Sequence, residues 1–265
     1  MKITALVENN SHCELKAKHG LSLYIETGNH KILFDLGPDD TLFQNAAKRN
    51  VDLKAVDTVI ISHGHLDHGG ALGKFLEVNK TAQVYVQKSA FLKHYTKVFG
   101  LRFPCGIKDQ FEGHPQVHLL EGNYKIDDTL ELFIVKDMSQ CYSTMNDALY
   151  TGKEHDQFEH EHHLIIHEPK GNVLIMGCGH GGVVNIMHAA EDWHPVLCIG
   201  GYHLMNPNSK KSVPESLLDG IVKALSAYSD TTFYTCHCTG EVPYRYLSER
   251  MKNLHYLSCG ESVTF

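Results

Sequence analysis

No apolar run in this 265-residue chain approaches the roughly 20 residues that a membrane-spanning helix needs. Residues 1–8 have the pattern of a β-strand and lack the long apolar region of a signal peptide. The eight cysteines do not have the spacing of a disulfide framework, and no Pro/Ser-rich linker divides the chain. We therefore expect one domain over residues 1–265, located in the reducing cytoplasm.

An excess of positive charge is also missing, because the formal net charge is −7. Proteins that hold nucleic acid through phosphate contacts carry the opposite balance. We therefore expect no nucleic-acid partner and no membrane partner, and a small molecule as the substrate. No pattern in the sequence indicates an oligomeric state.

Strand and helix patterns alternate along most of the chain, which predicts a layered α/β fold. Strands are predicted at residues 3–7, 21–26, 31–35, 56–62, 83–87, 117–120, 130–135, 164–168, 173–176, 196–199, 232–235 and 254–257. Helices are predicted at residues 41–49, capped by Asp40 and Thr41, and at 71–78, 183–192, 214–228 and 243–252. Residues 89–115 have the pattern of a helix followed by an irregular insertion, and residues 153–163 that of a loop.

Histidine is abundant, with 20 copies, and four potential metal ligands fall within six residues directly after the 56–62 strand. They are His63, His65, Asp67 and His68. In a turn that leaves the strand, the first two would bind one metal ion and the last two an adjacent one. Gly64, Gly69 and Gly70 allow the backbone to bend sharply and approach the ions. The alternative is a surface histidine cluster, which a buried strand leading into four ligands opposes.

This motif at the end of a hydrophobic strand resembles the signature of the metallo-β-lactamase superfamily. Segments 8–10, 19–22, 33–37, 177–185, 200–204 and 237–240 resemble one branch of it. That branch includes the archaeal dihydropterin–ribofuranosylaminobenzene phosphate synthases. The resemblance implies an αββα sandwich, in which two mixed β-sheets are flanked by helices and the metals lie at one edge between the sheets.

The resemblance also implies ligands beyond the first motif. His180 would complete one metal site with His63 and His65. His237 would complete the other with the Asp–His pair, and for both residues a structural histidine is the alternative. His203, at another strand end, is a candidate ligand, substrate contact or proton donor. The set implies one or two divalent ions, with zinc foremost and manganese, iron or magnesium as alternatives.

The sequence departs from the superfamily pattern at one position. Most hydrolases of the superfamily place a bridging acidic ligand in a Gly-Asp pair after a strand of the second half, but here the strand ends in Gly177-Cys178. A thiolate can bind zinc or iron. A buried cysteine packed as a small hydrophobe is the commoner role. Cys178 is therefore a possible ligand, and the second metal site could be labile or absent.

Several weaker patterns concern the surroundings of the site. Residues 153–163 hold four histidines among acidic residues, which favours a solvated loop over a further ligand. Cys236 and Cys238 flank His237 and could bind a metal or form a redox pair, but the absence of a second cysteine pair favours buried thiols that line the site. The glycine turn at 179–182 opens a predicted helix, where free N–H groups could hold a phosphate, and Thr239-Gly240 could do the same.

Three function classes follow from these patterns. The first is a metal-dependent hydrolase in which Asp67 orients a metal-activated hydroxide and His203 protonates the leaving group. The second is a transferase that resembles the pterin synthases and has diphosphate as its leaving group. Tyr202 and Phe103 would then stack on a flat substrate, and Arg102 and Lys108 are candidate substrate contacts. The third is a metal-binding protein without turnover, which the number of well-placed ligands opposes.

Overall fold

The computed structural model describes residues 1–265 and divides into two compact units. The first unit consists of Met1–Gly122, Leu149–His160 and Leu257–Phe265, and the second of Asn123–Ala148 and Glu161–Tyr256. Each unit contains its own seven-stranded mixed sheet. None of the helices is both long and apolar enough to cross a membrane.

The first unit contains eleven of the strands. They are β1 (Lys2–Val7), β2 (Ser22–Glu26), β3 (Lys31–Phe34), β4 (Thr58–Ile61), β5 (Gln83–Gln87), β6 (His94–Val98), β7 (Leu101–Pro104), β8 (Val117–Leu120), β11 (Leu149–Thr151), β12 (Glu154–His155) and β18 (Ser262–Thr264). Its helices are α1 (Thr41–Lys48), α2 (Leu66–Gly69) and α3 (Leu72–Val78), with 3₁₀ turns at Leu53–Ala55, Lys88–Phe91 and Asp109–Phe111. Asp40 is the N-cap residue of α1, as predicted, but its side chain makes no capping hydrogen bond, and the carboxylate of Asp39 accepts the backbone N–H of Thr41 at 3.0 Å.

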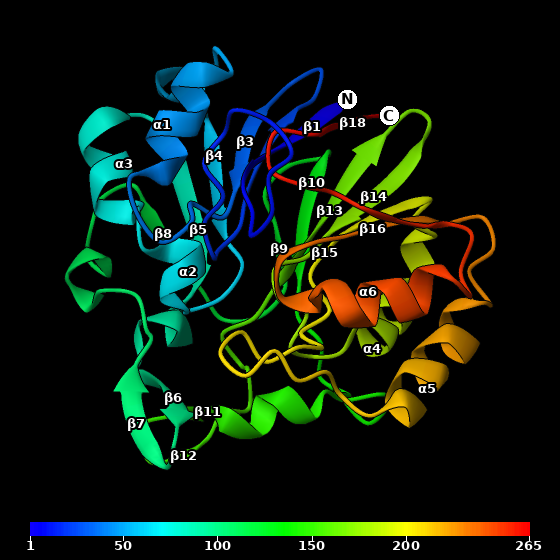
Figure 1. Ribbon diagram of the computed structural model, residues 1–265. Helices are drawn as coiled ribbons and strands as arrows, with labels where there is room; N and C mark the ends of the chain where they lie inside the picture. The colour runs from blue at the N-terminus through cyan, green and yellow to red at the C-terminus, as the bar shows by residue number, and fades with distance from the viewer. The chain divides into compact units, whose positions relative to one another are not determined.

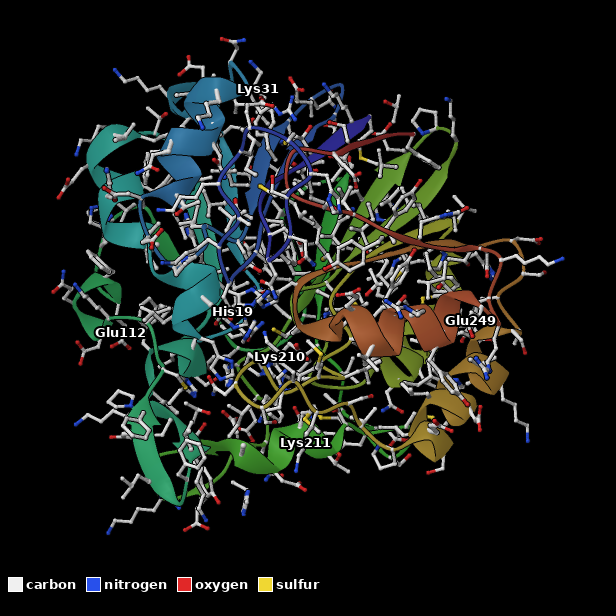
Figure 2. All side chains as sticks on the ribbon, in the orientation of Figure 1. His19, Lys31, Glu112, Lys210, Lys211 and Glu249 are labelled. Carbon is white, nitrogen blue, oxygen red and sulfur yellow. The ribbon has the colours of Figure 1, made fainter.

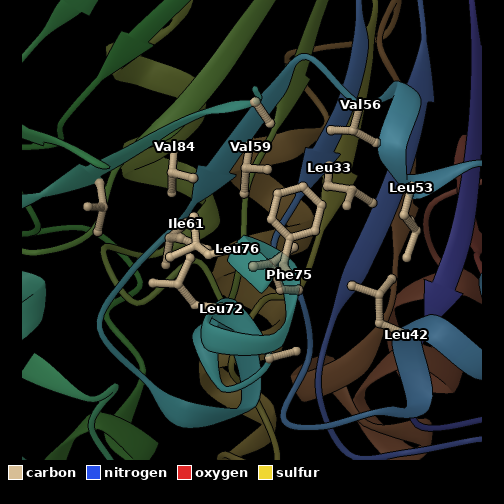
Figure 3. Packing of buried hydrophobic residues seen from close by; sticks show 14 of the residues in the cluster. Leu33, Leu42, Leu53, Val56, Val59, Ile61, Leu72, Phe75, Leu76 and Val84 are labelled. Atoms are coloured by element: carbon tan, nitrogen blue, oxygen red, sulfur yellow. The ribbon is translucent and has the colours of Figure 1, made fainter. Parts of the chain in front are cut away.

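The large sheet of the first unit has the order β18-β1-β2-β3-β4-β5-β8, and its last four strands run parallel. Strand β4 is buried at every position, as its β-branched sequence predicts. Helices α1 and α3 lie on one side of this sheet (Figure 1), where Phe75 packs with Val59 and Ile61 (Figure 3). Burial of one such side chain contributes about 1.5–3 kcal/mol to stability. Charged side chains such as Lys31 and Glu112 lie at the surface (Figure 2).

The prediction of a helix within residues 89–115 is wrong, because strands β6 and β7 form a hairpin there. Phe99 and Gly100 connect the strands with φ angles of +49° and +81°, which suit a tight hairpin turn. The hairpin belongs to a four-stranded sheet of order β12-β11-β6-β7. Strand β6 pairs with β11, about 50 residues along the chain, so a local pattern could not reveal this partner.

The second unit contains strands β9 (Tyr124–Lys125), β10 (Leu130–Phe133), β13 (His163–Glu168), β14 (Gly171–Ile175), β15 (Leu197–Gly200), β16 (Thr232–Thr235) and β17 (Leu254–Tyr256). Its helices are α4 (Val183–Ala189), α5 (Glu215–Leu225) and α6 (Glu241–Ser248), with 3₁₀ turns at Thr144–Ala148, Glu191–Trp193 and His237–Thr239. The predicted strands and helices of this half are all present, and the ends of most of them are displaced by a few residues.

The sheet of the second unit has the order β17-β16-β15-β14-β13-β10-β9. Strands β14 to β17 run parallel, so the segments that follow them leave the sheet at the same edge. Buried side chains of α4, α5 and α6 pack in one apolar cluster with Leu174, Cys198 and Phe233 of the sheet. Loops at the carboxyl ends of parallel strands commonly carry functional groups. The candidate residues of this unit lie in such loops, after β14, β15 and β16.

Candidate metal centre

The predicted metal motif of the first unit lies where β4 ends and α2 begins. His63, His65 and His68 have exposed fractions of only 0%, 6% and 0%. The ring centroid of His63 is 4.6 Å from that of His65 and 4.1 Å from that of His68. Asp67 is partly exposed, and its Oδ2 lies 3.4 Å from Nε2 of His19, which is labelled in Figure 2. The structure therefore gathers all four predicted ligands of this motif.

Hydrogen bonds fix the ring nitrogen with which two of these histidines can bind a metal. The buried carboxylate of Asp35 accepts the N–H and O–H of Ser62, each at 2.7 Å, and lies 2.6 Å from Nδ1 of His68. A carboxylate accepts, so His68 carries a proton on Nδ1. Because Ser62 donates its hydroxyl proton to Asp35, its oxygen accepts from Nδ1 of His63 at 2.8 Å. Both rings therefore present Nε2 for coordination, as metal-binding histidines do.

His180 of the second unit is fixed in the same way, by Asn146 in the 3₁₀ turn Thr144–Ala148. The Nδ2 of Asn146 donates to the backbone carbonyl of His180, and its Oδ1 lies 2.9 Å from Nδ1 of the same residue. Since Oδ1 accepts, His180 also carries its proton on Nδ1 and presents Nε2. A buried imidazole of this tautomer is suited to a divalent ion that prefers nitrogen ligands, such as zinc.

The glycine turn before α4 is not the phosphate site that the sequence predicts. The carboxylate of Glu161 accepts the backbone N–H groups of His180 and Gly181, each at 2.8 Å. The protein's own anion thus satisfies these donors, and a phosphate would have to displace it. Similarly, the hydroxyl of Thr239 lies 2.9 Å from the backbone N–H of Tyr202, which it accepts. Both groups stabilise turns of the second unit.

The stretch 153–163 is also not the solvated loop that its composition predicts, because most of its acidic and histidine side chains are buried. Within the first unit, Asp156 lies 3.0 Å from Nε2 of His160 and 3.2 Å from Nδ1 of His94, and it accepts the N–H of Phe158 at 2.8 Å. Burial alone would raise the pKa of Asp156. Hydrogen bonds from His160 and His94 outweigh burial and hold that pKa far below its ordinary value.

His65, His94, Asp156 and His160 together form a group whose potential ligand atoms lie within 4.8 Å of one another. The tautomer of His160 opposes a metal there. Its Nδ1 accepts the backbone N–H of Gly64 at 3.0 Å, so its proton is on Nε2 and is donated to Asp156. Burial lowers the pKa of His160, which favours this neutral form. The group instead anchors the backbone between the two ligands His63 and His65.

The other candidate residues of the second unit follow β14, β15 and β16. His203 and His237 have φ angles of +50° and +51°, a strained region for non-glycine residues that is common at functional sites. The rings of His203 and His180 are 4.2 Å apart. Burial would raise the pKa of the Cys238 thiol, but its interactions with Cys178 and His203 hold that pKa well below its ordinary value.

The structure thus places the predicted residues in two sets. The first unit holds His63, His65, Asp67 and His68, and the second holds Cys178, His180, His203 and His237. Sequence reasoning missed the partners that orient these ligands, namely Asp35, Ser62, Asn146 and His160. Asp35 lies within a segment that carries the family resemblance, which is the one signal that pointed to it.

The residues proposed as substrate contacts have other roles in two cases. Tyr202 is 1% exposed and belongs to the core of the second unit, so it cannot stack on a substrate from that position. Arg102 stacks on Tyr150 at 3.8 Å and donates to the backbone carbonyls of residues 152 and 153. Phe103 is 48% exposed on β7, and Lys108 is also exposed. Arg102 is exposed as well, so Tyr202 is the buried residue of the four.

Comparisons with known proteins found related sequences and structures. Residues 16–190 match the model of the metallo-β-lactamase superfamily. An uncharacterised protein of Methanocaldococcus jannaschii, MJ0448, is 26% identical over 98% of this chain and 99% of its own length. The 7,8-dihydropterin-6-methyl-4-(β-D-ribofuranosyl)-aminobenzene-5'-phosphate synthase of the same organism is 24% identical over 94% of this chain and 90% of its own.

Among solved structures, Tm1679, described as a metal-dependent hydrolase of the β-lactamase superfamily, is similar over 100% of this chain and 99% of its own. The TM-score is 0.83 and the sequence identity 24%. This likeness confirms the fold class that the sequence predicts.

Proposed function

Since the chain belongs to the metallo-β-lactamase superfamily, we propose that it is a metal-dependent hydrolase of a small, phosphorylated or ester-type molecule. The fixed tautomers of His63, His68 and His180 support this most strongly. A buried histidine with a purely structural role can use either ring nitrogen for its hydrogen bond, so no particular tautomer is expected. Here each ring turns its proton toward a protein acceptor and presents Nε2 for coordination.

Six residues are the proposed metal ligands. They are His63, His65, Asp67, His68, His180 and His237. Five nitrogen ligands and a single carboxylate suit zinc best, and manganese, iron or magnesium are the alternatives. We propose one or two such ions. Burial holds the pKa of His65 well below its ordinary value, so this ring is neutral and able to bind a cation at neutral pH.

A divalent ion in such a site lowers the pKa of water toward about 7 and polarises a phosphoryl or carbonyl oxygen. The carboxylate of Asp67 is the one partly exposed acidic group of the motif, and we assign it the orientation of the nucleophile. His203 is assigned the protonation of the leaving group. Its backbone carbonyl accepts the hydroxyl of Ser143 at 2.5 Å, which helps to hold its left-handed conformation.

Zinc-loaded protein is expected to hydrolyse a chromogenic phosphodiester or ester, and His65→Ala is expected to abolish that activity. Loss of a metal ligand should lower the activity by more than the roughly 10–100-fold expected when a residue that only orients a ligand is lost. His188→Ala is the matched control, because the His188 side chain is 69% exposed and distant in sequence from the motif. Protein that retains no metal by elemental analysis, or activity equal in His65→Ala and wild type, would refute the proposal.

A transferase is the second candidate, because the curated synthase matches nearly the whole chain. In that case a dihydropterin diphosphate would bind and release diphosphate to an organic nucleophile. We expect the two functions to separate in one experiment with zinc-loaded protein. Diphosphate release that depends on an added aminobenzene nucleophile, with no turnover of a broad ester and phosphodiester panel, would favour the transferase.

A further inference from the structure

We propose that Cys178 and Cys238 are thiolate ligands of one of the metal ions, together with His237. This inference rests on the proposed metal-dependent function. The two Sγ atoms and a ring nitrogen of His237 lie within 4.8 Å of one another, and all three residues are buried. Sulfur atoms at about 2.3 Å from a tetrahedral zinc are about 3.8 Å apart, so small adjustments would close the set on an ion.

The fold brings the two cysteines together from different strands of the second unit. Cys178 follows β14, and Cys238 lies in the 3₁₀ turn after β16, with β15 between them in the sheet. Gly201, at the end of β15, makes their approach possible. A Cβ at this position would lie 2.5 Å from Sγ of Cys238 and 3.5 Å from Cα of Cys178. Because Gly201 has no side chain, the Sγ of Cys238 can occupy this space and lie close to Cys178.

The Sγ of Cys238 has two backbone neighbours. The carbonyl of Cys178, 3.4 Å away, accepts the thiol proton, which metal binding would release. The backbone N–H of His203 points to the same Sγ at 3.3 Å, a donor that stabilises negative charge on sulfur. Cys198, on the neighbouring strand β15, is an internal contrast. It packs within the apolar core, and burial raises the pKa of its thiol, as expected for a cysteine that serves as a small hydrophobe.

This assignment explains the missing acid after β14. Where most hydrolases of the superfamily have a carboxylate, this chain has Cys178, and Cys238 supplies a second sulfur beside it. Soft thiolate ligands select zinc or iron over magnesium and manganese. We therefore expect zinc or iron at this site, and we expect that magnesium will not replace it.

The test is the absorption spectrum of the full chain loaded with cobalt(II) after reduction and removal of native metal. Thiolate ligation gives intense near-ultraviolet sulfur-to-cobalt charge transfer, whereas nitrogen and oxygen ligands give only weak visible bands. We expect this absorption in the wild type, about half of it in Cys178→Ser and in Cys238→Ser, and the full intensity in Cys141→Ser. Cys141 is a half-buried cysteine of the same unit and does not belong to the proposed ligand set.

Cobalt bound in stoichiometric amount without charge transfer would overturn the inference and leave the metal-dependent function intact. Failure to bind cobalt at all would overturn the proposed function, and the inference with it. If the serine variants do not fold, X-ray absorption at the zinc edge of the wild type decides instead. Two sulfur neighbours at about 2.3 Å are expected, and a shell of nitrogen and oxygen alone would contradict the assignment.

Discussion

Replacing Asp35 by asparagine is expected to weaken metal binding by about 10- to 100-fold, the usual effect of losing a partner that orients a ligand. Asp35 accepts three hydrogen bonds, from the N–H and O–H of Ser62 and from Nδ1 of His68. An asparagine retains one acceptor oxygen and turns an NH₂ group toward one of these donors. The ring of His68 and, through Ser62, that of His63 would then lose their fixed orientation.

Asp57→Asn is the matched control. Asp57 also accepts from a backbone N–H, a hydroxyl and an imidazole, namely Lys31, Thr58 and His30. Its side chain is 45% exposed and orients no predicted ligand. Competition with a chromogenic chelator measures zinc affinity for both variants. Unchanged affinity in the Asp35 variant, or an equal loss in both, would show that the Asp35–His68 contact does not prepare the site.

The strands that the sequence predicts well are those whose pattern is complete within the segment. The bounds of β5, β8 and β16 agree with the prediction at both ends, because each segment is rich in apolar and aromatic residues between clear turn signals. The hairpin of β6 and β7 was missed because it is stabilised by β11, which lies far along the chain. Both strands are short, and of the four residues of β7 one is charged and one is proline.

The candidate ligands could be predicted for a similar reason. His63, His65, Asp67 and His68 are adjacent in sequence, so one short motif contains the chemistry. Their orienting partners could not be predicted, because contacts such as Asp35 with His68 join residues 33 positions apart. Asn146 and His180 are separated by 34 positions. No local pattern distinguishes Asp35 or Asn146 from the other polar residues of the chain.

Burial was the property that composition predicted least well. The stretch 153–163 is as polar as a surface loop, yet Asp156 and His160 are buried because each satisfies the other's hydrogen-bonding groups. Burying a charge without a partner would cost several kcal/mol, so such a cluster is stable only as a whole. A composition-based argument treats each residue separately and therefore assigns the segment to solvent.

Gly64→Ala is expected to lower the free energy of unfolding by about 1–3 kcal/mol, as overpacking of a dense site does, and to weaken metal binding as well. A Cβ at this position would lie 2.5 Å from the backbone oxygen of Ala90 and 2.7 Å from Nε2 of His94. The backbone oxygen cannot rotate away, so the turn itself would shift. Gly64 also donates its N–H to His160, and it joins the ligands His63 and His65, so any shift displaces both rings.

Gly113→Ala separates this effect from the general cost of replacing a glycine. A Cβ at residue 113 would have no atom within 4 Å, so the unfolding free energy should change by less than about 1 kcal/mol. Urea unfolding and chelator competition on both variants measure stability and affinity independently. If Gly64→Ala matches Gly113→Ala in both, the close approach of Ala90 and His94 is not needed, and the buried His94–Asp156–His160 group does not hold the metal-binding turn. A stable Gly64 variant with weakened metal binding would instead show that the turn yields to the new methyl group and that its position governs the ligands.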